Sequence, residues 1–510
     1  MDVVPSPIFY PAIVLCLIFI LEWRKRAARN GLPLPPGPKG LPLVGNVFDL
    51  DIARPWLSYE GWGKQYGALV YSNLLGQDFV VLNTEKLAHE LLDQRSTIYS
   101  DRPYLSTNKL FGLDFNSGLL PYGNKWRLHR KMFHVALSKE VVPKYRPMQM
   151  EKVHQLLENL LKNPREYDQH FKTVSAAIIM AITYGYDVSP SRDPFVSRIE
   201  ELLELFLDAL TPERATLLGA IPFLQHIPSW LPGGRYKRRA SECRALAAGV
   251  LDDPVAYVKN HMAAGGERKC LVQDLYKKEL GESTEPDQEE EIKAVAATVF
   301  LGGAETTYST LLAFLLAMVL NPDAQTKAQE EIERVVGTER LPSFSDRPSL
   351  PYVEAVLLET MRCYPSVPIA LPHMTSKSDV YDGMYIPKGK SLSFRAIVLI
   401  NIWAITHDKT NFPDPMAFNP ERFLTSSGAL GEGKQSHASF GFDQSVWASI
   451  VSILATLRVG KARDEFGKEI EIKPEFTTGL SVHPKPFLCS IVPRSPKAER
   501  LIIASNVNED

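Results

Sequence analysis

The chain has 510 residues, of which 45% are hydrophobic, so it can bury a large core as one big domain or two. Its formal net charge is −2, which gives no indication of nucleic acid or an acidic surface as a partner. Five cysteines, at positions 16, 243, 270, 363 and 489, have no CxxC or CxxH spacing, which predicts reduced thiols in a cytosol-facing protein and no zinc site.

The N-terminal segment is expected to anchor the chain in a membrane. Residues 3–21 form an apolar run, interrupted by three prolines, and a basic cluster at residues 24–29 follows it. A cleaved signal peptide has its basic residues before the apolar run, whereas here they come after it. The run is long enough for one span, and the basic cluster predicts a cytosolic C-terminal side. We expect a retained signal-anchor at residues 1–29; a short buried helix is the alternative.

Residues 30–49 contain the proline-rich sequence LPPGPKGLPLVGN, which cannot be helical and is semi-rigid. We expect a tether that holds the remaining body, residues 50–510, at the membrane. Two short strands are predicted at residues 68–71 and 79–82, on either side of Gly76. The pattern is then mainly helical, most clearly at residues 85–95, 150–161, 193–210 and 236–262.

Trp126 and Arg130 lie one helical turn apart in the sequence WRLHR. An indole N–H and a guanidinium on one helix face can converge on a single carboxylate. A solvated basic face is the alternative, and these residues alone leave both open.

Residues 290–320 are continuously apolar and predict a buried helix of about 45 Å, at roughly 1.5 Å per residue. The helix should end at Asn321, because a residue before proline disfavours helix.

The middle of this helix reads Gly302-Gly303-Ala304-Glu305-Thr306. Each glycine costs about 1 kcal/mol relative to alanine, so we expect another group to approach the backbone here or the helix to open. An acid and a hydroxyl in apolar surroundings indicate proton handling beside a bulky ligand. A small-residue packing contact with back-bonded threonines is the alternative.

Two more helices are predicted, at residues 322–336 and 350–361. Glu359 and Arg362, at i and i+3, are spaced to pair with each other and with a third group. Arg422, in the sequence PERF, is the candidate third member.

In this order, the anchor, the PPGPKGLPLVGN tether, WRLHR, GGAETT, ETMR and NPERF resemble the cytochrome P450 family over nearly the whole chain. The resemblance is to membrane-anchored fungal haem-thiolate monooxygenases. It implies a mainly α fold with small β-sheets (α+β) behind an N-terminal transmembrane helix. It also implies haem, O2 and oxidation of a small apolar substrate, such as an aromatic, a terpenoid or another secondary metabolite.

The family also implies where the protein works and with what partner. Because the chain has no G-x-G-x-x-G dinucleotide motif, its electrons must come from elsewhere. The implied donor is NADPH-cytochrome P450 reductase on the same endoplasmic reticulum membrane, with the catalytic domain facing the cytosol.

The resemblance assigns roles residue by residue. Trp126 and Arg130 match the pair that binds the haem propionates, and His373 lies where the family often has another propionate partner. The family's buried ion triad corresponds to Glu359, Arg362 and Arg422.

On the long helix, Glu305 and Thr306 match the acid–alcohol pair that delivers protons to bound dioxygen. Gly302 and Gly303 match the positions that make room for it. This agrees with a hydroxyl and a carboxylate serving as proton donors in an apolar segment.

The chain departs from the family where the haem iron is bound. The family holds the iron with a cysteine in a loop that begins with phenylalanine, and Phe440 begins this loop here. The chain then continues directly into a helix-like sequence, so about ten residues, including the cysteine, are absent and no metal ligand is assigned. His437 is an alternative ligand, although a solvated loop histidine is expected.

A second irregularity is an insertion near residues 390–400. We interpret the two as a misassembled gene model or a splice form of an active enzyme. The competing hypothesis is a catalytically inactive, membrane-anchored product that lacks the haem cysteine.

Overall fold

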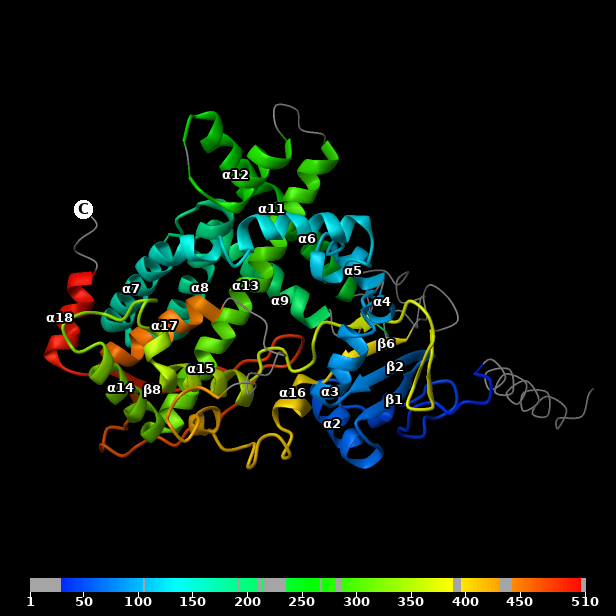
Figure 1. Cartoon of the computed structure of the whole chain (residues 1–510). Coiled ribbons are helices and arrows are strands. Elements are labelled where there is room, and N and C mark those ends of the chain that lie inside the picture. Colours follow the sequence, from blue (N-terminus) through cyan, green and yellow to red (C-terminus); the bar gives the residue numbers. More distant parts are fainter. Residues whose placement is uncertain are drawn as a thin grey trace, which may run out of the picture.

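The computed structural model describes residues 29–103, 106–189, 193–209, 213, 216, 235–266, 268–280, 286–388, 396–431 and 443–505. The predicted anchor before residue 29 and Phe440 lie outside the described residues. The fold is mainly helical with small sheets, as predicted. Helices gather around α13 on one side, and the largest sheet lies on the other side with α2 and α3 (Figure 1).

The α-helices of the described residues are α2 (Pro55–Tyr66), α3 (Glu85–Ala88), α4 (Ser96–Tyr99), α5 (Ser106–Phe111), α6 (Asn124–Leu137), α7 (Arg146–Lys162), α8 (Tyr167–Tyr184), α9 (Pro194–Ala209), α11 (Arg235–Ala263), α12 (Leu271–Leu275), α13 (Pro286–Leu320), α14 (Pro322–Val335), α15 (Pro351–Cys363), α16 (Ile402–Thr406), α17 (Asp443–Thr456) and α18 (Pro496–Ser505). Short 3-10 or π turns are η1 (Val47–Asp49), η2 (His89–Asp93), η3 (Ser117–Leu119), η4 (Val142–Tyr145), η5 (Pro164–Glu166), η7 (Tyr276–Leu280), η8 (Arg347–Ser349) and η9 (Pro420–Phe423).

The centre of the fold is α13, which the sequence predicted from residue 290. It begins at Pro286, because proline suits a first helical turn and the acidic residues that follow favour a helix N-terminus. Its part Gln288–Leu320 is long and apolar enough to span a membrane, but 83% of the most apolar window is buried inside the protein. Here α13 is therefore a core helix.

Two apolar clusters cover α13. Its first half, residues 292–304, packs with side chains of α5, α6, α8, α9, α11 and α12. Its second half, residues 308–319, packs with side chains of α7, α8, α14, α15 and α17. A helix that is apolar on all faces requires this complete cover.

For most other predicted helices, the first and last residues lie within a few positions of the prediction, as α7, α9, α11, α14 and α15 show. The helix predicted at residues 85–95 is confirmed from Glu85 to Asp93, but its second part is not α-helical. It is divided into α3 and the π turn η2, in which the Gln94 amide donates to the His89 carbonyl. Apolar spacing does not distinguish bonds that span four residues from bonds that span five.

The largest sheet has the order β1 (Leu69–Leu74), β2 (Gln77–Leu82), β6 (Ile397–Ile400), β3 (His373–Met374). β1 and β2 form an antiparallel hairpin through Leu75 and Gly76, whose positive φ angles suit a two-residue turn. β2 pairs in parallel with β6. Two smaller sheets pair β4 (Asp379–Tyr381) with β5 (Met384–Ile386), and β7 (Leu457–Lys461) with β8 (Cys489–Pro493).

The proline-rich segment lies against this sheet. The Tyr71 amide donates to the Pro36 carbonyl at 2.9 Å, and the Asn46 amide donates to the Asn73 carbonyl at 2.7 Å. A Cβ at Gly45 would lie 2.0 Å from the Asn73 carbonyl oxygen, and Gly45 has a φ of +65°, so only glycine fits here. This segment is thus docked on β1.

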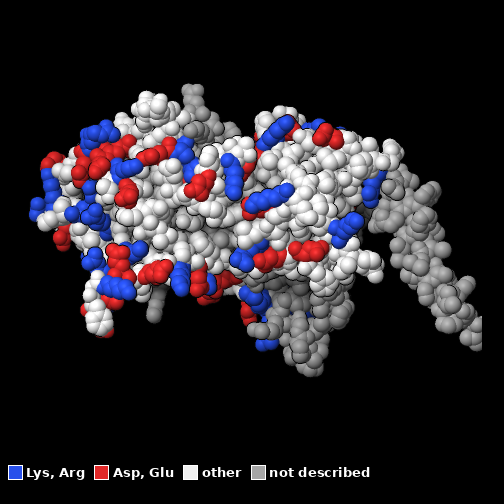
Figure 2. Space-filling model, turned by 90° about the horizontal axis from the view of Figure 1, so that it is seen from below, with Lys and Arg blue, Asp and Glu red and all other residues white. Residues whose placement is uncertain are grey.

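The surface carries both signs of charge. In the view of Figure 2, acidic and basic side chains are interspersed along the molecule. This agrees with the small net charge of the sequence.

Glu359 is the buried centre of an ion triad. Its carboxylate accepts two hydrogen bonds from the Arg362 guanidinium, at 2.6 and 2.8 Å, and one from Arg422 Nε at 3.1 Å. It also accepts the Asn419 amide at 2.7 Å. Because Arg362 donates in turn to the carbonyls of Thr406 and Pro415, one carboxylate joins α15 to the coil before η9.

We expect Glu359→Gln to destabilise the protein by about 3–5 kcal/mol, because it leaves the buried Arg362 guanidinium and the partly buried Arg422 guanidinium without their charge partner. Urea unfolding followed by circular dichroism measures the change. The matched control is Glu475→Gln, which removes the exposed pair with Lys485 and should cost at most about 1 kcal/mol. Equal losses in the two variants would contradict the structural role of the triad.

Candidate active site

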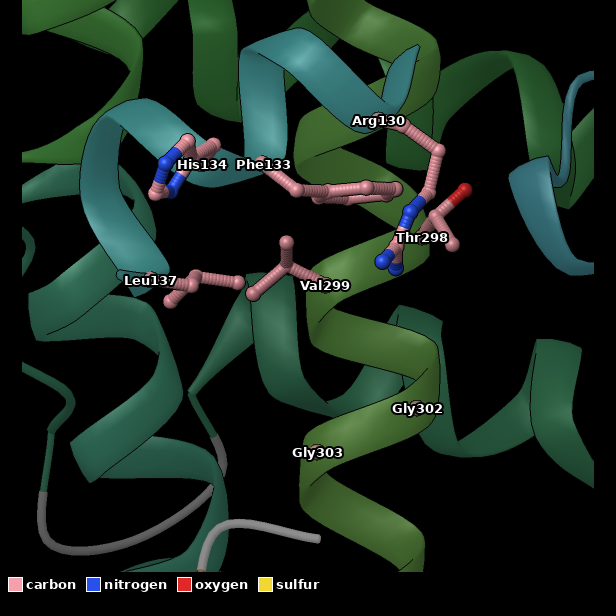
Figure 3. A pocket seen from close by; sticks show the side chains of 8 residues that line it. All are labelled: Arg130, Phe133, His134, Leu137, Thr298, Val299, Gly302 and Gly303. Carbon is pink, nitrogen blue, oxygen red and sulfur yellow. The ribbon is translucent and has the colours of Figure 1, made fainter. Parts of the chain in front are cut away.

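A cavity of about 380 Å³ lies between α6 and the middle of α13 (Figure 3). Its lining residues are Arg130, Phe133, His134 and Leu137 of α6 and Thr298, Val299, Gly302 and Gly303 of α13. Figure 3 shows the Phe133 ring across the cavity, with Leu137 and Val299 facing each other below it. Phe133, Leu137 and Val299 give part of the wall an apolar surface, whereas Arg130 brings a positive charge to it.

Gly302 leaves a bare surface on α13. The residue is exposed although its helix neighbours Leu301 and Ala304 are buried, and a Cβ at Gly302 would meet no atom within 4 Å. Open space beside a core helix is the opposite of a small-residue packing contact, which would put a neighbour against the glycine. The expected close approach of another group is therefore sterically possible here, and the helix itself stays regular.

Arg130 and Trp126 lie on one face of α6, as their spacing predicted. The Arg130 guanidinium lies 5.8 Å from the centre of the Trp126 ring, within the range of a cation–π contact. Arg130 lines the cavity and Trp126 does not. Among the described residues, no carboxylate lies within ion-pair distance of Arg130, so its charge is available to an anion in the cavity.

Glu305 and Thr306 have different partners. The Thr306 hydroxyl donates to the Gly302 carbonyl at 2.8 Å. The Glu305 carboxylate accepts from the hydroxyls of Ser481, at 3.1 Å, and Ser309, at 3.4 Å. The two predicted proton donors are therefore not in contact, and neither lines the cavity between α6 and α13.

His373 lies in β3, away from this cavity. Its Nδ1–H donates to the Tyr99 carbonyl at 2.8 Å. Burial, reinforced by the nearby Arg102 charge, lowers the pKa of His373 to about 4, so the ring is neutral at pH 7. Arg102, which the sequence analysis did not identify, donates to the carbonyls of Leu371 and Pro372 and fixes the segment before His373.

Thr298 was also missed. It lies one helical turn before Gly302 and lines the same cavity. The four-residue spacing places both on one face of the predicted helix, and this signal was available in the sequence. The buried His129, at the centre of WRLHR, was missed because its partners are distant in sequence.

The cavity can be compared with the haem that the resemblance implies. A bare helix surface at Gly302 and a guanidinium at the rim fit a flat ligand that carries carboxylates. The four described cysteines, at positions 243, 270, 363 and 489, do not line the cavity. No cysteine occurs between positions 363 and 489, so none follows Phe440 before α17. The residues present fit the macrocycle and its propionates, but the described cysteines do not supply the axial thiolate.

The lowered pKa of His373 predicts a pH dependence of stability. An unfolded histidine, with a pKa of about 6.5, binds a proton that the folded one rejects, so stability should be lost as pH falls from 6.5 towards 4. We expect His373→Asn to lose less of its melting temperature than the wild type between pH 7 and pH 5. The control is His89→Asn, which replaces an exposed histidine. A parallel loss in the wild type and His373→Asn would rule out this contribution.

Comparisons with known proteins agree with this architecture. A family model described as "Cytochrome P450" matches residues 35–443 and ends just after Phe440-Gly441-Phe442. Cytochrome P450 monooxygenase 208 of Postia placenta is 36% identical over 507 residues, which cover 97% of this chain and 96% of that protein. Cytochrome P450 monooxygenase COX2 of Coprinopsis cinerea is 36% identical over 493 residues, which cover 93% of this chain and 92% of that protein. Cytochrome P450 monooxygenase claR of Ampulloclitocybe clavipes is 37% identical over 483 residues, which cover 92% of this chain and 88% of that protein. The chain belongs to the cytochrome P450 family of haem-thiolate monooxygenases.

Proposed function

We propose that this chain oxidises a small apolar compound, such as an aromatic, a terpenoid or another secondary metabolite. The co-substrate is O2, and NADPH-cytochrome P450 reductase supplies the electrons. The observation that carries the proposal is the bare Gly302 surface in the middle of a buried helix, with Arg130 at the rim of the same cavity. A bound haem supplies the oxygen activation, and the family holds its iron through a cysteine thiolate.

The chain's own residues bind and orient this group. Arg130, supported by the Trp126 ring, would pair with a propionate. Gly302 and Gly303 would leave room for this group beside α13, and Phe133 and Leu137 would shield it from water. Glu305 and Thr306 remain the proposed proton donors. Their pairing requires the Glu305 carboxylate to leave Ser481 and Ser309.

Substrate contacts are proposed near η3 and before β3. A Cβ at Gly118 would lie 3.1 Å from a methyl carbon of Leu371, so these two segments already touch. Leu371 then supplies an apolar wall beside η3, whose Ser117 amide bonds to Thr298 in the first half of α13. This wall favours apolar substrates, since it offers few polar partners.

We further propose that residues 1–29 anchor the chain in the endoplasmic reticulum membrane and that residues 50–510 form the catalytic domain in the cytosol. The docking of the proline-rich segment on β1 supports a body that begins close to the proposed anchor. A reductase on the same membrane then meets a body whose sheet lies close to the anchor.

Haem retention tests the proposed cofactor site. We expect the full chain in detergent to retain added haem through gel filtration and Gly302→Leu to retain roughly tenfold less, because the new side chain fills the space beside α13. The matched control is Gly61→Leu, a helical glycine on the surface whose Cβ also meets open space. Failure of the wild type to retain haem would contradict the proposal.

The spectrum of the retained haem tests the axial ligand. In the reduced, carbon monoxide-bound state we expect no thiolate-type band, because no cysteine follows Phe440 before α17. A thiolate-type band would show that another cysteine of the chain reaches the iron. Sequencing the transcript across residues 386–401 and 440–445 distinguishes a splice form from an inactive product.

A further inference from the structure

Three large apolar side chains lie exposed at the N-terminal end of the described chain. Leu41 is 55% exposed, Leu43 is 92% exposed and Phe48 is 78% exposed. The first two belong to the proline-rich segment, and Phe48 lies in the turn η1 that follows it. We call these three residues the N-terminal apolar patch. A single exposed apolar residue is ordinary, but several on one short stretch of chain are typical of a contact surface.

The turn that carries Leu43 is fixed by backbone hydrogen bonds. The Leu41 amide donates to the Gly45 carbonyl and the Gly45 amide donates to the Leu41 carbonyl, both at 2.9 Å. The Leu75 amide, at the tip of the β1–β2 hairpin, donates to the Val44 carbonyl at 3.2 Å. The turn is therefore closed on itself and fastened to the sheet, so the backbone holds Leu43 outwards.

Leu43 combines a strained backbone with an exposed apolar side chain. Its φ angle is +69°, in the left-handed region that a branched side chain rarely adopts. Asparagine or glycine would suit this turn better, both in backbone conformation and in contact with water. The free body gains nothing from a leucine here. Such a local conflict is typical of a residue that serves a contact with a partner.

The chain before the patch indicates which partner this is. Residues 3–21 form the apolar run of the proposed anchor, and the basic cluster at residues 24–29 follows it. The body is attached soon afterwards, because the Pro33 carbonyl accepts the Tyr385 amide of β5 at 2.7 Å. Leu41 follows Pro33 within the same proline-rich segment. A bilayer that holds the anchor is therefore the apolar phase nearest to the patch.

We propose that Leu41, Leu43 and Phe48 enter the interface of the lipid bilayer and form a second membrane contact, made by the folded body itself. This inference rests on the proposed anchoring of residues 1–29. An anchor alone limits the distance of the body from the membrane, whereas an anchor and a patch together also fix its tilt.

The charges beside the patch are compatible with a lipid surface. Lys39 is exposed two residues before Leu41 and is suited to pair with lipid phosphates. The nearest acid in the sequence is Asp49, whose carboxylate accepts a hydrogen bond from Asn46 Nδ2 at 3.1 Å. The apolar side chains are thus next to a free cation and a carboxylate that already has a partner.

Quenching by brominated lipid tests the contact directly. The full chain is placed in phosphatidylcholine nanodiscs with or without bromine on the acyl chains, and the emission that Phe48→Trp adds to the wild-type signal is measured. Bromine should reduce this added emission by about half, because an interfacial side chain reaches the start of the acyl region. The matched control is Phe466→Trp, which should not be quenched.

Phe466 is a suitable control because it is also an exposed phenylalanine on a turn. Its side chain is 86% exposed, and it follows β7, which pairs with β8. β8 and α18 lie at the opposite end of the molecule from β1 and β2 (Figure 1). A bilayer that meets the patch therefore does not reach Phe466.

Leu43→Asn separates the membrane contact from stability. In the Phe48→Trp background, this change should reduce the quenching roughly twofold, because it removes the most exposed apolar group of the patch. Its melting temperature should be equal to or higher than that of the parent, since asparagine tolerates the left-handed backbone. Phe466→Asn in the same background should leave the quenching unchanged.

The possible outcomes distinguish the patch from the anchor. A chain that stays in the nanodisc while Phe48→Trp is quenched no more than Phe466→Trp would overturn the patch alone. Unchanged quenching in Leu43→Asn would also overturn it. If alkaline carbonate extracts the full chain from vesicles although Phe48→Trp is quenched, the patch stands and the anchor is wrong. A chain that does not bind lipid at all contradicts both.

Discussion

A helix that is apolar around its whole circumference has to be covered around its whole circumference, and α13 imposes this condition on the fold. Two apolar clusters provide the cover, and nearly every long helix contributes to one of them. The exception is Gly302, where the cover is open. Because burial is the main stabilising term, an uncovered stretch at the centre of such a helix indicates a place for a ligand.

Much of the fold could be predicted from the local sequence. The end of α13 just before Asn321, the helices α7, α11, α14 and α15, and the β1–β2 hairpin all follow from apolar spacing and from proline or glycine at the ends. The start of α13 and the π turn after α3 could not be predicted, because the positions of helix ends depend on hydrogen bonds that apolar spacing does not encode. Family membership was also recognised from motif order, and the comparisons confirm it.

The site was less predictable, since its partners come from distant segments. Glu305 and Thr306 are adjacent in sequence, but neighbours on a helix point about 100° apart, so adjacency does not make them a pair. The carboxylate instead bonds to Ser481, 176 residues away. His129 bonds to Glu291, 162 residues away. Such pairings depend on how helices cross, and periodicity within one helix carries no information about that.

The docked proline-rich segment limits how far the folded body can stand from a bilayer. With residues 1–29 as the proposed anchor, only the stretch between Arg29 and Pro33 is left as slack, because the Pro33 carbonyl already accepts the Tyr385 amide of β5. Even fully extended, four residues reach only about 14 Å at roughly 3.5 Å per residue, and the bond from the Leu32 amide to the Arg29 carbonyl turns this stretch back on itself. The body is therefore held close to the bilayer. An apolar compound dissolved in the lipid then has only a small distance to cross before it meets the protein.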